Sequence, residues 1–128
     1  MSQIEILKEF KTQVLAFFDE LIGQFPREGD LVVVRLFLAN QIPIKEVMDK
    51  FILKLTRNNN ELRRMVKERN EIFFLEHNIF QSVSKEQTNN FRKLWMSGQL
   101  DSDDKEVIWK WIEAFIFLAD KYTAALNK

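Results

Sequence analysis

Residues 101–122, with the sequence DSDDKEVIWKWIEAFIFLADKY, form the longest and most apolar periodic stretch of the chain. Apolar residues recur along it at spacings of three and four, which places them on one face of an α-helix. The residues of this face are Val107, Trp111, Phe115, Leu118, Tyr122 and Ala125, widened by Ile108, Ile112, Ala119 and Leu126. A helix with so wide an apolar face is usually buried on most of its sides. We therefore predict that this stretch is the central helix of the fold.

An acidic cluster opens this stretch. The oxygens of residues 101–104 can accept hydrogen bonds from the first N–H groups of a helix, and their charge suits its positive end. Asp103, with Glu106 three residues later, resembles a capping box. The apolar run is interrupted by Lys110 and Glu113 and is shorter than the about 20 residues that cross a bilayer. We therefore predict a capped helix and no membrane span.

The polar arc of the predicted helix is narrow and contains an aromatic residue. Its polar members are Lys110, Glu113, Asp120 and Lys121. Phe117 falls in the middle of this arc, and Trp109 falls at its edge. Burial against another part of the chain is one interpretation, and contact with a partner is the other, because aromatic residues are enriched at the centres of interfaces. The candidate partner-interface residues are Trp109, Phe117, Lys110 and Glu113.

Residues 31–39, LVVVRLFLA, are ambiguous between strand and helix. Their β-branched run is compatible with a buried strand. However, no second segment alternates with period two, so a strand here would lack a partner for its backbone groups. We therefore favour a helix, with Asp30 as a candidate cap.

Helical patterns also account for the other segments. Ser2 and Glu5 form a capping box for a first helix that we expect to stop at Gly23. A third helix follows Pro43 and is expected to fray at residues 57–60, and a fourth runs from there to about residue 73. A fifth is expected over residues 84–97, with a capping box of Ser84 and Gln87, a stop at Gly98 and a buried stripe of Phe91, Leu94 and Trp95. The sum predicts an all-α fold, a compact single-domain bundle of five to six helices over residues 1–128.

Catalytic chemistry finds little support in the composition. The chain has no cysteine and one histidine, His77, which leaves few members for a nucleophilic triad or a metal site. Its three glycines stand far apart, so no phosphate-binding loop is present. We therefore expect a protein that is not an enzyme and has no catalytic, cofactor or metal site. The lack of cysteine fits an intracellular setting.

A basic stretch is the most distinctive polar feature. Its cations are Arg57, Arg63, Arg64, Lys67 and Arg69. On a helix, several of these share one face that can contact phosphates or an acidic protein. Interleaved Glu61, Glu68 and Glu71 can instead neutralise it locally. A solvated face, a protein-partner site and a nucleic-acid site all remain open, although the formal net charge of zero gives no general indication of nucleic-acid binding.

Residues 31–51 and 94–122, with the acidic cap leading into Val-Ile-Trp-Lys-Trp, resemble small uncharacterised helical proteins of nucleocytoplasmic large DNA viruses of algae and protists. The resemblance covers under half of the chain, and implies a viral protein located in the host cytoplasm or the virion. Our leading hypothesis is a non-enzymatic structural or interaction protein that self-associates or docks on a larger assembly. The alternative is a nucleic-acid-binding accessory protein that uses residues 57–69.

Overall fold

The structure, a computed structural model, describes residues 2–76 and 92–127, and this part of the chain contains helices and no strand. The helices are α1 (Gln3–Gln24), α2 (Gly29–Asn40), α3 (Ile44–Lys67), α4 (Glu71–Glu76) and α6 (Ser102–Leu126), and residues 92–96 are also helical. The all-α prediction is confirmed, and so is the helix favoured for residues 31–39. His77, the Ser84–Gln87 capping box and Phe91 lie outside the described residues.

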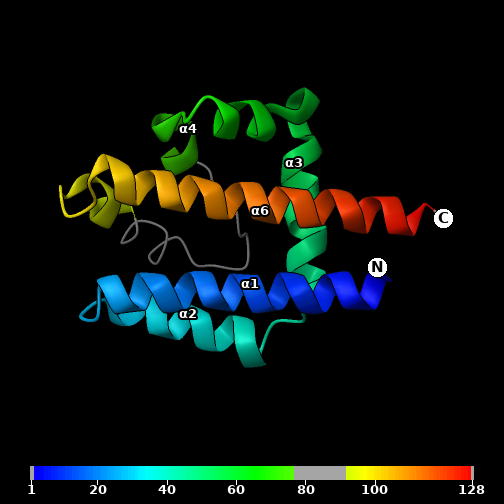
Figure 1. The fold of residues 1–128 in the computed structure, drawn as a ribbon, viewed down its shortest axis with the longest axis horizontal. Coiled ribbons are helices and arrows are strands. Elements are labelled where there is room, and N and C mark those ends of the chain that lie inside the picture. The colour runs from blue at the N-terminus through cyan, green and yellow to red at the C-terminus, as the bar shows by residue number, and fades with distance from the viewer. Residues whose placement is uncertain (1, 77–91, 128) are drawn as a thin grey trace.

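The two longest straight helices, α1 and α6, lie side by side and run in opposite directions (Figure 1). The start of α1 meets the end of α6, where the Gln3 side chain donates to the carbonyl of Ala125 at 3.5 Å. Further along, Trp111 Nε1 donates to Glu20 Oε2 at 2.8 Å. In the same view α3 crosses α6, and α2 lies below α1 at the edge of the molecule.

The core is built on aromatic rings from three helices. Phe115 of α6 has no exposed surface and meets Phe10 and Phe17 of α1 edge to face, with ring centroids 5.8 and 5.7 Å apart. Phe10 in turn stacks on Phe51 of α3 at 6.1 Å. Edge-to-face and offset contacts of this kind are favourable beyond the area that they bury. The prediction that residues 101–122 form a central helix therefore holds, since α6 joins α1 and α3 through these rings.

The capping boxes were predicted correctly for α1 and wrongly for α6. Ser2 and Glu5 cap α1 reciprocally as expected. At α6 the capping pair is Asp101 with Asp104: the Asp104 N–H donates to Asp101 at 2.8 Å, and the Asp101 N–H donates to Asp104 at 3.2 Å. Asp101 has the extended backbone of a cap residue, whereas Asp103 is already inside the first turn.

Two other predicted boundaries are displaced by one or two residues. The first helix continues past Gly23 to Gln24, and the N–H of Phe25 closes it on the carbonyl of Leu21 at 2.8 Å. The side chain of Phe25 is buried, so the core extends beyond the expected glycine stop. At α2 the cap position is Glu28, without a side-chain bond, and Asp30 lies in the first turn.

A corner divides α3 into two halves. Arg57 is extended, with ψ of 147°, and Asn58, Asn59 and Asn60 have φ of 51°, 58° and 64°. These are left-handed conformations, which asparagine tolerates better than most residues. Fraying was expected at this place, but the chain instead makes a defined turn, and the second half of α3 leads along the top of Figure 1 toward α4.

The prediction of a new helix after Asn60 is right about its start, since a separate helical segment follows the corner, but wrong about its end, because this segment stops at Lys67 and does not reach Phe73. Arg69 adopts φ of 55°. The Asn70 N–H then reaches the carbonyl of Met65 at 2.9 Å, and the Arg69 N–H reaches that of Val66 at 3.1 Å. This is the Schellman arrangement that terminates helices. Asn70 also begins α4, since its side-chain oxygen accepts from the N–H of Phe73 at 3.0 Å.

Candidate protein-interaction surfaces

Arg69, one of the predicted nucleic-acid contacts, is half-buried and bound by other residues of the chain. Its guanidinium donates to Glu106 at 3.1 and 2.8 Å, to Glu113 at 2.7 Å and to the carbonyl of Val66 at 2.8 Å. The hydrogen bond to Glu106 raises the pKa of Arg69, and the same bond lowers the pKa of Glu106. Arg69 therefore fastens the end of α3 to α6 and is not available to a phosphate.

Arg63 is also held by α6. Its guanidinium forms a two-pronged contact with the Asp120 carboxylate, with one of the two distances at 2.8 Å. This hydrogen bond raises the pKa of Arg63. Two of the five predicted cations are thus neutralised by carboxylates of α6.

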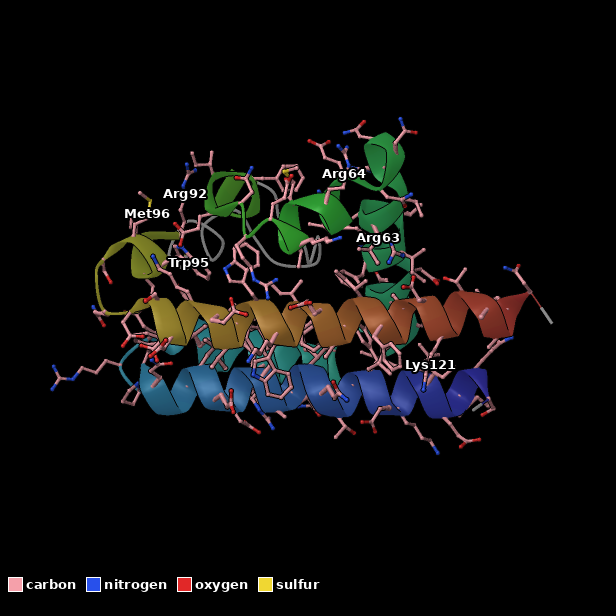
Figure 2. The ribbon with its side chains drawn as sticks, turned by 45° about the horizontal axis from the view of Figure 1, so that its top comes forward. Arg63, Arg64, Arg92, Trp95, Met96 and Lys121 are labelled. Atoms are coloured by element: carbon pink, nitrogen blue, oxygen red, sulfur yellow. The ribbon has the colours of Figure 1, made fainter. Side chains whose placement is uncertain are left out.

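The remaining cations of the basic stretch face solvent. Arg57, Arg64 and Lys67 are exposed and form no ion pair within the described part of the chain. Figure 2 shows Arg64 at the outer side of the second half of α3. The structure therefore separates the predicted basic face into two cations that hold the fold together and three that are accessible.

Trp109 was predicted as a partner contact, and this prediction is wrong because the side chain is 3% exposed. Its ring meets Trp95 edge to face at 5.8 Å, and the guanidinium of Arg69 lies 5.8 Å from its centroid. Trp95 is anchored by Glu71, which accepts from its indole N–H at 3.1 Å. A helical wheel of residues 101–122 cannot reveal this contact, because the side of α6 that carries Trp109 is covered by a separate segment.

Phe117 is 58% exposed, so the interpretation that its ring is buried against another part of the chain does not hold for the described residues. The ammonium of Lys121 lies 4.7 Å from its ring centroid, a cation–π geometry that covers part of the ring. Lys110 and Glu113 are exposed beside it on α6, although Glu113 holds Arg69. This arc therefore presents one large aromatic side chain among charges.

A larger apolar surface, not anticipated from the sequence, lies on α2. Leu31, Val34 and Leu38 face α1 and are buried. The opposite side of α2 carries four large apolar side chains that are each exposed to between 40% and 51%: Val32, Val33, Leu36 and Phe37. We call these four residues the α2 face. At a helical spacing of i, i+1, i+4 and i+5 they are contiguous, and no charged residue interrupts them.

The edges of the α2 face are polar and paired. Arg35 lies to one side and binds Asp19 of α1 through two contacts, at 2.6 and 3.3 Å. Lys11 of α1 reaches the end of α2, where its ammonium donates to the carbonyl of Ala39 at 2.9 Å. An apolar centre with a polar rim is the composition of protein interfaces.

One signal in the sequence could have located this face. The run at residues 31–39 is apolar on most sides of a helical wheel, with Arg35 as its one charged residue, which indicates burial on most sides. Among the helices that the structure describes, α2 packs chiefly on α1, and the apolar side chains on its other side are exposed. The helical wheel shows which sides of α2 are apolar, but the number of helices that pack against α2 depends on the whole fold. The local sequence does not contain that number.

Other kinds of site are scarce in the described ranges. Among residues 2–76 and 92–127, no three carboxylates are gathered closely enough to hold a metal ion. No helix in these ranges has the length and apolarity needed to cross a membrane. In comparisons with known proteins, no family model, curated protein or solved structure matches the chain.

Proposed function

We propose that the protein is a non-enzymatic interaction protein that uses the α2 face to self-associate or to dock on a larger assembly. The observation that supports this is the concentration of four large, half-exposed apolar side chains on one short helix. Together they present on the order of 300 Å² of apolar surface, taking roughly 150–200 Å² for each side chain when fully exposed. Patches of about this size on a monomer are often functional.

The arc around Phe117 supports the same function less strongly. Its single ring is partly covered by Lys121, and Trp109 contributes nothing to it because that residue is buried. Isolated exposed apolar side chains are common on protein surfaces and need no explanation, whereas the largest contiguous patch on a monomer is often functional. For the setting of the assembly, the resemblance to helical proteins of large DNA viruses implies a virion or a host cytoplasm.

A photo-crosslinking amino acid at Val32 tests the proposal in cells that naturally contain the protein. We expect a defined crosslinked adduct at this position. The matched control is Leu53, which is similarly exposed but lies on α3, and there we expect no defined adduct. The absence of a defined adduct at Val32, or an equal yield at Leu53, would contradict the proposal.

Nucleic-acid binding is a second candidate function, supported by the exposed Arg57, Arg64 and Lys67. The affinity for a single strand should fall as the salt concentration rises. For three phosphate contacts, a plot of the logarithm of the affinity against the logarithm of the salt concentration should have a slope of about −2. Fluorescence anisotropy with a labelled 20-nucleotide strand measures this slope, and Arg64→Glu should weaken binding. Failure of the wild-type protein to bind in low salt would end this hypothesis.

A further inference from the structure

The α2 face has properties that suit a second copy of the same chain. Its four residues form two pairs, Val32–Val33 and Leu36–Phe37, placed symmetrically about the middle of the helix. A two-fold axis at that middle, perpendicular to α2, makes two helices antiparallel and sets the valine pair of each copy against the Leu–Phe pair of the other. Interfaces of this kind must be self-complementary, and a face that carries no charge does not repel its own copy.

The charges around the face also fit an antiparallel arrangement. Glu28 precedes the N-terminal end of α2, and Lys11 stands at the C-terminal end, on the carbonyl of Ala39. An antiparallel pair brings the Glu28 end of each copy to the Lys11 end of the other, although Arg27 offsets part of the negative charge. The charges beside the middle of the face are already balanced in each copy by the Arg35–Asp19 pair. The zero net charge of the chain adds no long-range repulsion.

We infer that the α2 face is the interface of a weak homodimer in which the α2 helices of two copies pack antiparallel. This inference rests on the proposed function, because it names the occupant of the same surface. The apolar area of on the order of 300 Å² per copy is well below the about 800 Å² per partner of a standard stable interface. The dimer is therefore reversible, with a dissociation constant of roughly 0.1 mM or weaker.

Sedimentation velocity between 0.01 and 1 mM protein tests the inference. We expect the weight-average sedimentation coefficient of the wild type to rise with concentration. Leu36→Glu places a charge in the face and should weaken association at least about tenfold. Leu53→Glu is the matched control, because it makes the same substitution at a similarly exposed position on α3, and it should associate like the wild type.

Cysteine crosslinking tests the antiparallel geometry, and the chain has no native cysteine to interfere. Residue 33 lies near the proposed two-fold axis, so Val33→Cys should form a disulfide-linked dimer under mild oxidation. Residue 40 lies at the end of α2, so the two copies of Asn40→Cys should be roughly 16 Å apart along the helix axis, at 1.5 Å per residue. This exceeds the about 7 Å limit between Cα atoms that a disulfide spans.

The outcomes are distinct. A monomer at every concentration, a dimer unaffected by Leu36→Glu, or crosslinking of Asn40→Cys as efficient as that of Val33→Cys would each overturn the antiparallel homodimer. A monomer whose Val32 photo-crosslinks to one foreign protein overturns the homodimer but leaves the proposed function standing. A monomer without any crosslinked adduct overturns both.

Discussion

Arg69 occupies a backbone conformation that most side chains avoid. With φ of 55° it stands at the position in the Schellman motif where glycine is most common. A non-glycine residue in this region costs roughly 1–2 kcal/mol. The side chain offsets that cost through its bonds to Glu106, Glu113 and the carbonyl of Val66, and through its position over Trp109. The contacts of the arginine side chain are therefore favourable at this position, whereas its backbone conformation is unfavourable.

Substitutions at Arg69 separate these two effects. Arg69→Ala loses the ion pairs and keeps the unfavourable φ, whereas Arg69→Gly loses the ion pairs and relieves the backbone. We expect both variants to be less stable than the wild type, and Arg69→Gly to be more stable than Arg69→Ala by about 1 kcal/mol. Urea denaturation gives the free energies of unfolding. An Arg69→Gly variant no more stable than Arg69→Ala would show that the backbone at this position is not strained.

The bond between Arg69 and Glu106 also makes stability depend on pH. The pKa of Glu106 in the folded protein is lowered from its ordinary value of 4.5, chiefly by this hydrogen bond. Its contribution to stability is therefore present above about pH 4.5 and is lost as the pH falls through the lowered pKa. We expect Glu106→Gln to melt below the wild type at pH 6, and the difference in Tm to shrink toward pH 3. A difference that stays constant over this range would contradict the assignment.

At the scale of elements, the corner in α3 is set by three successive asparagines. It turns the second half of the helix so that Arg63 reaches Asp120 and Arg69 reaches Glu106 on α6. A continuous helix through residues 57–60 would lead this half away in a straight line. The left-handed turn is therefore a condition for the ion pairs that close the fold on this side.

Asn59 offers a clean test of the corner, because it is exposed and has φ of 58°. We expect Asn59→Ala to lower the free energy of unfolding by about 1 kcal/mol, since alanine tolerates the left-handed region poorly. Asn59→Gly should be nearly neutral, because glycine adopts that region without a steric cost. Thermal melting monitored by circular dichroism compares the two. Equal stability of the two variants would mean that the corner rearranges on substitution.

The sequence predicted most helices because spacings of three and four mark a buried face directly, as in α1 and α6. It failed at the end of α3, where the run from Leu62 to Phe73 keeps a helical period across the left-handed Arg69. That break depends on carboxylates 37 and 44 residues further along the chain, and no local pattern encodes them. Similarly, Trp109 is buried against Trp95, and the α2 face is exposed because, within residues 2–76 and 92–127, α2 packs chiefly on α1 alone.

At the scale of the molecule, the core and the surface can be contrasted on one helix. Phe115 and Phe117 lie two residues apart on α6, so they point to different sides. Phe115 has no exposed surface and contacts rings of α1, which makes it part of the junction that holds α1, α3 and α6 together. Phe117 is mostly exposed and contacts Lys121. The same substitution at the two positions therefore compares how much a buried ring and an exposed ring contribute to the free energy of unfolding.

We expect Phe115→Ala to lower the free energy of unfolding by about 3–5 kcal/mol, because it removes a buried ring and leaves a cavity among rigid aromatic neighbours. That is a large part of the 5–15 kcal/mol of total stability that is typical of a domain. Phe117→Ala should lower it by no more than about 1 kcal/mol, the worth of an exposed cation–π contact. Urea denaturation of both variants, with the slope of the transition compared as well, checks the contrast. Equal losses at the two positions would require the ring of Phe117 to be covered by another protein surface in solution, and the loss at Phe117 would then depend on protein concentration.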